Sequence, residues 1–244
     1  MGGPSGKFPT TRWSAIVAAR SEDSAERARG LETIATSYWK PVYKYIRLRW
    51  GKSNEEAKDL TQEFFARAIE KGFLDKFDPA KGRLRTFLRT CVDGLVANHH
   101  KAATRLKRGG GAAEIPLDFD TAEEELHRVE VAAPDSMEDF FEREYTRNLF
   151  SLAVESFRRQ CEEQGKTLHF RIFELYDLED GANARPTYQS LADQYGISAT
   201  DVTNHLAFCR REFRRLVLER LRELTSNDEE FRREARALLG VETP

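Results

Sequence analysis

The side chains whose types best suit chemistry lie between residues 198 and 215, where short polar residues precede a group of arginines. Short polar side chains hydrogen-bond to base edges, whereas arginines bind phosphates. This order is typical of a helix in a groove of DNA, although an ordinary helical hairpin with a solvated basic face would also produce it. The residues that we expect to contact DNA here are Thr200, Asp201, Thr203, Asn204, His205, Arg210, Arg211 and Arg214.

The surrounding sequence predicts two helices joined by a tight turn. Apolar residues recur at helical spacing from Tyr188 to Phe213. Gly196 falls between the two helical stretches, and glycine readily adopts the left-handed conformation that such a turn requires. Ser198 and Asp201 form a capping box, so the second helix should begin directly after Ser198. This arrangement indicates a helix-turn-helix.

The composition predicts a folded chain. Of its 244 residues, 40% are hydrophobic and 11% are aromatic, which argues against disorder and allows one large or two small domains. No apolar run approaches the length that spans a membrane, and the first residues lack the apolar core of a signal peptide. We therefore expect a cytoplasmic protein that does not bind a membrane.

The small net charge of −2 conceals a strong asymmetry along the chain. Between residues 83 and 108, seven basic residues face the single acid Asp93. Between residues 114 and 144, twelve acids face only Arg128 and Arg143. Positive charge returns in the predicted helix-turn-helix, so surfaces for nucleic acid are expected on both sides of an acidic connector.

Apolar periodicity predicts helices along almost the whole chain, and no alternating apolar segment of convincing length predicts a strand. The expected helices cover residues 24–37, 41–50, 53–71, 84–106, 136–164, 168–178 and 228–239, with a break at Pro41. We therefore predict an all-α fold of two small helical domains. The expected parts are a domain at 1–111, an acidic linker at 112–135 and a domain with the helix-turn-helix at 136–244.

Residues 55–65, Glu-Glu-Ala-Lys-Asp-Leu-Thr-Gln-Glu-Phe-Phe, closely resemble a signature of bacterial RNA polymerase sigma factors of the extracytoplasmic-function type. Residues 77–105 follow the outline of that family's next segment, and residues 188–206 are similar to its promoter −35 helix-turn-helix. The resemblance covers nearly the whole chain. The sequence departs from the family where Lys58 replaces an acid, at Gly94 and Asn98, in a longer loop around Gly181, and at residues 203–205, which replace a basic cluster.

The resemblance implies a sigma factor that binds core RNA polymerase and promoter DNA. The implied polymerase contacts, which could instead form a solvated acidic face, are Glu55, Glu56, Asp59, Gln62 and Glu63. The residues that would bind the backbone of the melted −10 strand are Arg83, Arg85, Arg89 and Lys101. Phe77 would either stack on an unpaired base or belong to the core.

The variant Asp-Leu-Thr-Gln-Glu-Phe-Phe resembles sigma factor groups that are associated with Ser/Thr protein kinases. It predicts that a kinase phosphorylates Thr61 and so supplies the negative charge that Lys58 removes, unless Thr61 merely fills a helix position. The acidic linker is expected to mimic a nucleic acid strand in the polymerase channels, or else to act only as a solubilising tether.

Enzyme motifs are absent from the sequence, which has no glycine-rich phosphate loop, nucleophile triad or metal-binding spacing. His99 and His100 are adjacent on a predicted helix and cannot chelate one ion together. Cys91, Cys161 and Cys209 are far apart and should be reduced, buried thiols. We expect no enzyme activity and no cofactor. The alternative function is a helix-turn-helix regulator with a helical N-terminal sensor domain.

Overall fold

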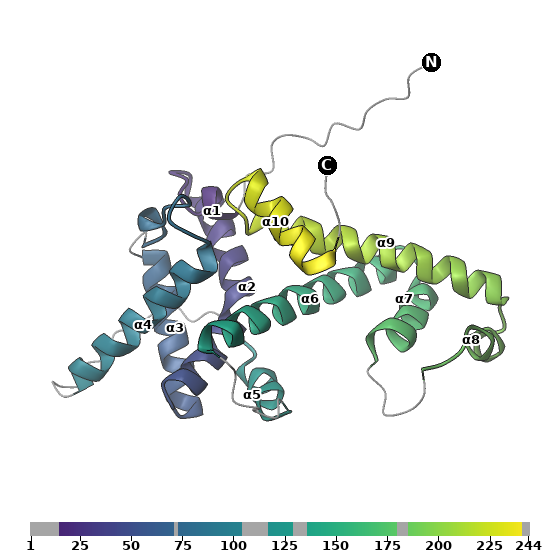
Figure 1. Ribbon diagram of the computed structural model, residues 1–244, viewed down its shortest axis with the longest axis horizontal. Coiled ribbons are helices and arrows are strands. Elements are labelled where there is room, and N and C mark those ends of the chain that lie inside the picture. The colour runs from purple at the N-terminus through teal and green to yellow at the C-terminus, as the bar shows by residue number, and fades with distance from the viewer. Residues whose placement is uncertain (1–14, 71–72, 104–116, 129–135, 180–184, 241–244) are drawn as a thin grey trace, which may run out of the picture. The chain divides into compact units, whose positions relative to one another are not determined.

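The chain folds into helices, as the computed structural model in Figure 1 shows. The structure describes residues 15–70, 73–103, 117–128, 136–179 and 185–240, and none of these residues forms a β-strand. The predicted all-α class is therefore confirmed. The chain divides into two compact units, which are described separately below: unit 1 comprises residues 1–148 and 221–244, and unit 2 comprises residues 149–220.

Several helices of unit 1 contribute large buried side chains to one core. Its core contains Tyr38, Val42, Tyr43, Tyr45, Ile46, Ala57, Leu60, Phe64, Leu84, Leu88, Val92 and Val96. The elements of unit 1 are α1 (Ala15–Ala18), α2 (Ser24–Arg49), α3 (Asn54–Glu70), η1 (Phe73–Lys76), α4 (Leu84–Ala103), α5 (Phe119–Arg128), the first half of α6 (Met137–Glu163), and α10 (Asp228–Leu239).

Helix α2 passes through Pro41 without a break, so the predicted end of a helix before Pro41 is wrong. Proline lacks an N–H group and cannot donate to the carbonyl of Ser37, four residues earlier. The amide of Asn148 supplies the missing donor, because its Nδ2 lies 2.9 Å from the Ser37 oxygen and 3.2 Å from the Thr36 oxygen. A partner more than a hundred residues away therefore satisfies the carbonyl that Pro41 leaves unpaired.

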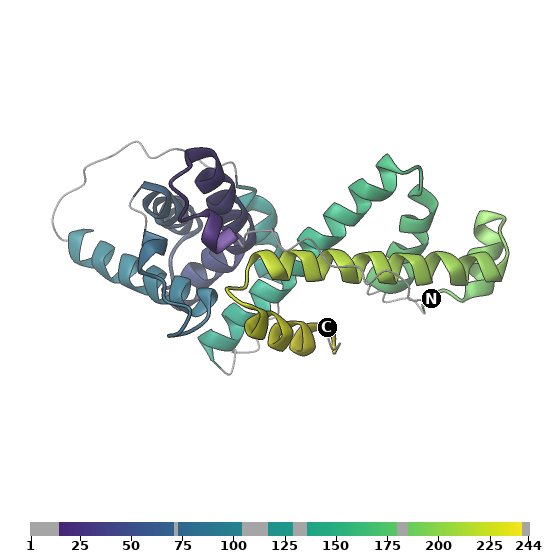
Figure 2. The same ribbon diagram turned by 90° about the horizontal axis from the view of Figure 1, so that it is seen from above.

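Unit 2 consists of the second half of α6, α7 (Thr167–Phe173), the π-helical turn η2 (Glu174–Leu178), α8 (Tyr188–Tyr195) and α9 (Ala199–Glu223) up to residue 220. Figures 1 and 2 show α7 close to the ends of α6 and α9 that belong to this unit. The rings of Phe157 on α6 and Phe173 on α7 meet edge to face, and Phe173 also contacts Phe213 on α9. These aromatic contacts are the centre of the core of unit 2.

The units differ from the predicted domain bounds at the C-terminal side. Residues 136–148 and 221–244 lie in unit 1, although the sequence predicted one domain from 136 to 244. The cause is that the first half of α6 and the whole of α10 bind helices of unit 1, through contacts such as those of Asn148 with α2.

Candidate polymerase-binding and DNA-binding surfaces

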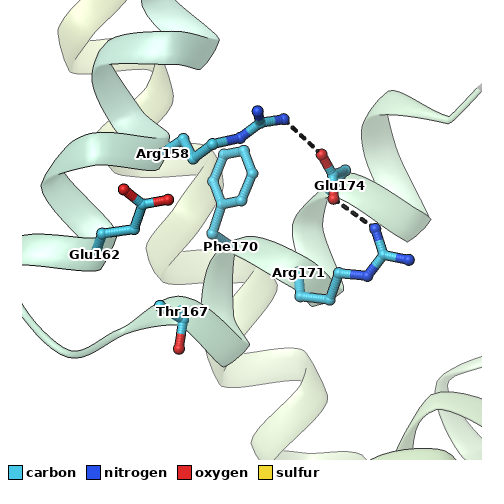
Figure 3. Close-up of a pocket in the computed structure, with 6 residues that line it drawn as sticks. All are labelled: Arg158, Glu162, Thr167, Phe170, Arg171 and Glu174. Carbon is cyan, nitrogen blue, oxygen red and sulfur yellow. Dashed lines mark hydrogen bonds and ion pairs between the residues drawn. The ribbon is translucent and has the colours of Figure 1, made fainter.

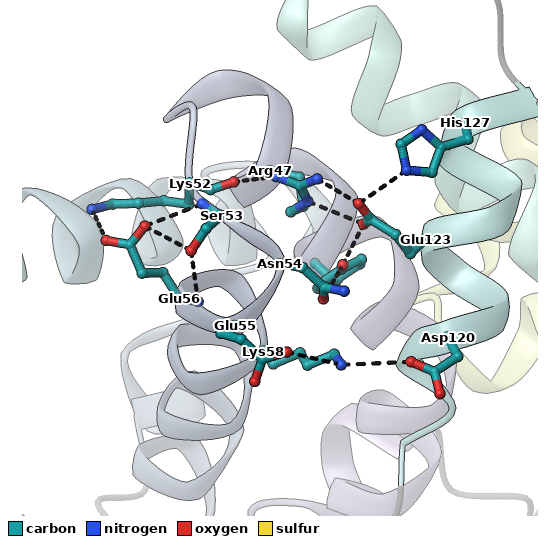
Figure 4. Close-up of polar contacts among 11 residues, drawn as sticks. Arg47, Lys52, Ser53, Asn54, Glu55, Glu56, Lys58, Asp120, Glu123 and His127 are labelled. Atoms are coloured by element: carbon teal, nitrogen blue, oxygen red, sulfur yellow. Dashed lines mark hydrogen bonds and ion pairs between the residues drawn. The ribbon is translucent and has the colours of Figure 1, made fainter.

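Helix α3 begins at the predicted capping box. The backbone N–H of Glu56 donates to Ser53 Oγ over 3.3 Å, and Glu56 Oε2 accepts from the Ser53 N–H over 3.1 Å (Figure 4). Hydrogen bonds from Lys52 and Ser53 lower the pKa of Glu56 to about 2. Glu56 is therefore ionised and held in the cap, and its main role in this structure is to start α3.

The other predicted polymerase contacts lie along α3 and remain accessible. Glu55 and Asp59 are exposed one turn apart, and Gln62 and Glu63 are half-buried further along the same helix. Glu63 pairs with Arg67 and lies 3.8 Å from His99 Nε2 of α4. The structure thus brings Glu55, Asp59, Gln62 and Glu63 onto one face of one helix, at positions i, i+4, i+7 and i+8.

Lys58 interrupts this acidic face, and two carboxylates flank it. Its Nζ lies 3.3 Å from Glu55 Oε1 on α3 and 3.5 Å from Asp120 Oδ1 on α5 (Figure 4). The hydrogen bond to Glu55 and the charge of Asp120 raise the pKa of Lys58. Asp120 comes from the predicted linker, so the sequence interpretation of α3 missed a neighbour that the fold supplies.

Thr61 is fully buried, with 0% of its surface exposed, and the prediction of a phosphorylation switch at this residue is corrected. Its Oγ1 donates to the Ala57 carbonyl over 2.7 Å, four residues back on α3. The position belongs to the buried stripe that also contains Leu60 and Phe64. A kinase cannot reach this hydroxyl while α3 is packed in unit 1.

The described part of the predicted acidic linker forms a helix whose acids bind α2. Glu125 on α5 lies 2.7 Å from the Nζ atoms of both Lys40 and Lys44. Glu123 on α5 accepts from Arg47, including a bond of 3.0 Å from Nε (Figure 4). Glu123 and Glu125 are occupied within unit 1, so the expected mimicry of a nucleic acid strand is corrected for these two acids.

Apolar contacts fix α5 in the same place. Phe119, Ala122 and Leu126 are buried at positions i, i+3 and i+7 of the helix. The Phe119 ring packs against the rings of Trp39 and Tyr43 on α2, with centroids 5.4 and 5.2 Å apart. This apolar spacing was visible in the sequence and was the signal that the linker contained a docked helix.

Arg85 is 6% exposed and belongs to the core of unit 1, so its prediction as a phosphate contact is corrected. Its Nε donates to Glu142 Oε1 over 2.6 Å, and its Nη2 donates to Glu234 Oε2 over 2.8 Å. The guanidinium also lies 5.1 Å from the centre of the Tyr145 ring. A buried cation requires such partners, which come from α6 and α10.

Two further arginines of the basic stretch at residues 83–108 have acidic partners, but their side chains remain partly exposed. Arg83 Nε lies 3.2 Å from Glu234 Oε1, and Arg89 Nη2 lies 2.8 Å from Glu138 Oε1. Both side chains are partly exposed, so a phosphate could displace these carboxylates more readily than those of the buried Arg85. Lys101 lies in the last turn of α4, and its side chain is outside the described residues.

Phe77 belongs to the core, which is one of the two roles that the sequence allowed. It is 4% exposed, and its ring contacts that of Phe87 with centroids 5.4 Å apart. Arg20 lies 5.7 Å from the centre of the same ring and donates to the carbonyl of Leu74. The expected stacking of Phe77 on an unpaired base is therefore corrected for this conformation.

In unit 2, local hydrogen bonds define the two predicted helices around residue 196. Thr187 Oγ1 accepts from the Ser190 N–H over 3.0 Å at the start of α8, and Gly196 ends α8 in the left-handed region with φ of 65°. Ser198 Oγ accepts from the Asp201 N–H over 3.0 Å, and Asp201 Oδ2 accepts from the Ser198 N–H over 3.1 Å. The predicted capping box and turn are thus present.

The first turns of α9 expose most of the polar side chains that the sequence assigned to DNA. Thr200, Asp201, Thr203 and Asn204 are exposed. Two of them have local partners, because Asp201 holds the cap and Thr203 donates to the Ala199 carbonyl over 3.0 Å.

His205 is half-buried, because its ring stacks on that of His169 in α7 with centroids 3.7 Å apart. Burial, His205 and Lys166 together lower the pKa of His169. The inner side of α9 is therefore occupied by packing, and the accessible polar residues are on the opposite side.

The arginines of α9 differ in their freedom. Arg210 is held by Asp177, with Nε 2.8 Å from Oδ2 and Nη2 3.0 Å from Oδ1. Arg211 is 70% exposed, and its nearest carboxylate, Glu212, is 3.8 Å away. Arg214 is exposed and has no ion-pair partner among the residues that the structure describes. Arg211 and Arg214 are thus the most available cations of this helix.

A pocket in unit 2 contains cations but leaves neither of them free (Figure 3). Glu174 accepts from Arg158 over 2.8 Å and from Arg171 over 2.6 Å. The Arg158 guanidinium also lies 5.1 Å from the centre of the Phe170 ring. This carboxylate neutralises the charge that an anionic ligand would require.

The described residues provide neither a metal site nor a membrane-spanning helix. Within the described ranges, no group of three or more His, Cys, Asp or Glu side chains could hold a metal ion. None of the described helices combines the length and apolar character needed to cross a membrane. The three cysteines are free thiols, with Cys161 and Cys209 buried and Cys91 half-buried.

The comparisons with known proteins bear on unit 1. Residues 35–106 match the family model of sigma-70 region 2, a range that begins within α2 and includes α3 and α4. No curated protein and no solved structure matched the chain. Members of the sigma-70 family are transcription initiation factors without enzymatic activity. The similarity to sigma-70 region 2 thus lies within unit 1, over the helices α2 to α4.

Proposed function

We propose that this protein binds core RNA polymerase through the exposed acidic face of α3 and directs it to promoters as a sigma factor of the extracytoplasmic-function type. The observation that carries the proposal is that Glu55 and Asp59 are exposed one turn apart within the range that matches sigma-70 region 2. Exposed carboxylates of this kind suit a partner surface rich in arginine. The run at residues 55–65 supports the assignment to this type.

The proposal gives unit 2 the role of binding the promoter −35 element through the pair α8 and α9. Arg211 and Arg214 would bind phosphates, while Thr203 and Asn204 would reach base edges from the start of α9. In unit 1, Arg83 and Arg89 are the candidates for phosphate contacts near the −10 element, because both are partly exposed.

Phosphorylation of Thr61 is not part of this proposal. The buried hydroxyl and its bond to the Ala57 carbonyl provide no accessible acceptor for a kinase. A kinase partner therefore has no support from the packing of α3, and the negative charge near Lys58 comes from Glu55 and Asp120 instead.

The test is capture of core RNA polymerase by the full chain, followed by run-off transcription on genomic fragments. The double variant Glu55→Lys and Asp59→Lys should capture much less polymerase than the wild type, because it reverses two charges on the exposed acidic face of α3. Glu32→Lys is the control, since Glu32 is an exposed acid that belongs to α2 and not to α3. Equal capture by all three proteins would overturn the assignment of the acidic face, and no capture by the wild type would overturn the sigma factor function.

A further inference from the structure

Unit 2 contains a charged cluster that the proposed DNA contacts do not explain. Asp177 lies in the π-helical turn η2 and binds two arginines, Arg185 before α8 and Arg210 on α9. It accepts two hydrogen bonds from Arg210 of α9, over 2.8 and 3.0 Å, and one from Arg185 Nη2 over 2.7 Å. Arg185 precedes α8, and its Nε also donates to the Tyr176 carbonyl over 2.8 Å.

An aromatic side chain completes the cluster. The ring of Tyr176 lies 4.0 Å from the Arg185 guanidinium and 5.7 Å from that of Arg210. Tyr188 of α8 meets the same ring edge to face, with centroids 5.0 Å apart. The cluster thus joins η2, the residues that lead into α8, and α9.

The pairing reduces the charge that α9 can offer to DNA. A phosphate could bind Arg210 through Nε and Nη2 only after displacing the Asp177 carboxylate, which uses both groups. The side chain of Asp177 is only 16% exposed, so it has little freedom to turn away into water. The hydrogen bonds that Arg210 donates to Asp177 also raise the pKa of Arg210, as expected for a persistent ion pair.

We propose that Asp177 is a specificity-determining residue, which weakens the sequence-independent attraction of α9 for DNA by engaging Arg210 and Arg185. This inference rests on the proposed DNA-binding role of unit 2. Phosphate contacts dominate non-specific affinity, whereas base contacts distinguish sequences. An acid that pairs with two arginines therefore lowers the non-specific affinity for DNA. The preference for particular sequences then depends on residues such as Thr203 and Asn204.

The experiment compares full-length wild type with Asp177→Asn, which keeps the side-chain size and removes the charge. The probe is a short mixed-sequence DNA duplex, and the measurement is its dissociation constant by fluorescence anisotropy at several salt concentrations. Asp177→Asn should bind more tightly at low salt. Its plot of log affinity against log salt should be steeper by about 0.9 for each phosphate contact that the released arginines form.

A matched control separates release of the arginines from a change in net charge. Asp193→Asn removes the same charge from α8, where the carboxylate of Asp193 accepts from Gln189 over 2.8 Å and has no arginine partner among the described residues. Asp193→Asn should change the slope much less than Asp177→Asn. Equal slopes for the two variants, or no change in Asp177→Asn, would overturn the proposal. Thermal unfolding should show that both variants remain folded.

A selection from a random-sequence DNA pool tests the specificity directly. The wild type should enrich particular sequences more strongly than Asp177→Asn, and equal enrichment would contradict the inference. The variants Arg211→Ala and Arg214→Ala separate a failure of the Asp177 proposal from a failure of the proposed DNA surface on α9. If they flatten the wild-type salt dependence while Asp177→Asn has no effect, only the role of Asp177 is wrong. If they also have no effect, the DNA surface on α9 is wrong and the role of Asp177 falls with it.

Discussion

The arginines of α4 and those of α9 come from similar basic stretches, yet the fold places them in opposite environments. Arg85 in α4 is buried and binds carboxylates that are 57 and 149 residues away in the sequence. Arg211 in α9 is 70% exposed, and its nearest carboxylate belongs to the next residue. A basic stretch in a sequence can therefore supply either the ionic core of a domain or its surface for a polyanion.

The difference depends on which basic residues the fold places next to acidic ones. In unit 1, Glu138, Glu142 and Glu234 pair with arginines of α4. Glu144 of α6 and the acids Glu123 and Glu125 of α5 pair with cations of α2. Burying a charge without a partner costs several kcal/mol, so the cations and acids of unit 1 must stay together. In α9, Arg211 and Arg214 have no such distant acid among the described residues, and both remain accessible.

The largest expected effect concerns the buried arginine, Arg85. Glu234→Ala should lower the free energy of unfolding by about 3 kcal/mol, because it leaves Arg85 buried with only Glu142 as its partner. Arg211→Ala on α9 should change stability by less than about 0.5 kcal/mol. Urea unfolding of both variants measures the difference. Similar losses for the two variants would contradict the assignment of Arg85 to the core.

A second prediction concerns another distant partner in unit 1, the amide of Asn148. Asn148→Ala should lower the free energy of unfolding by about 1–3 kcal/mol, because it leaves the buried carbonyl of Ser37 without its donor. Pro41→Ala restores an N–H group at the position that normally donates to Ser37. In the Pro41→Ala background, Asn148→Ala should therefore cost less, and urea unfolding of the four proteins measures this coupling. Fully additive losses would show that Asn148 does not compensate for Pro41.

The salt dependence of DNA binding tests whether the exposed arginines of α9 bind phosphates. Arg211→Ala and Arg214→Ala should each reduce the slope of log affinity against log salt by about 0.9, as expected for loss of one phosphate contact. Arg89→Ala should have a smaller effect, because Glu138 occupies its guanidinium. Anisotropy titrations of the full chain provide the slopes. A larger effect of Arg89→Ala would place the main phosphate contacts in unit 1.

The smallest expected effect is a difference in how the units respond to acid. The pKa of His169 in unit 2 lies below its ordinary value of 6.5, because burial, His205 and Lys166 disfavour the charged form. Its contribution to stability is complete above about 6.5 and is lost as the pH falls through the lowered pKa.

Unit 1 should respond only at lower pH. Hydrogen bonds from Arg47 hold the pKa of Glu123 below its ordinary value of 4.5, so this stabilisation is complete above that value and is lost as the pH falls further. Amide hydrogen exchange between about pH 7 and pH 5 should therefore show loss of protection in unit 2 before unit 1. The variant His169→Gln should remove most of this early loss. Simultaneous loss in both units would contradict the prediction.

The helices and their ends were largely predictable from the sequence. The caps at Ser53, Ser198 and Asn227 and the turn at Gly196 form between residues three or four positions apart, so a short stretch of sequence contains both partners. The continuous α2 was not predictable in the same way, because the donor that compensates for Pro41 is on α6.

The candidate site was only partly predictable. The sequence placed Glu55, Asp59, Arg211 and Arg214 on helices, and the structure leaves them accessible. Thr61 shows the limit of that approach, because the sequence predicted a hydroxyl that a kinase would phosphorylate and packing buried it completely.

By itself, the sequence determined that the chain is helical, where most helices begin and end, and which segments carry charge. These properties depend on neighbours within a few residues. Only the tertiary structure decided which charges are available to a partner. Ion pairs and burial depend on distances in space, and residues such as Glu123, Glu142 and Glu234 reach their cations only after the chain has folded.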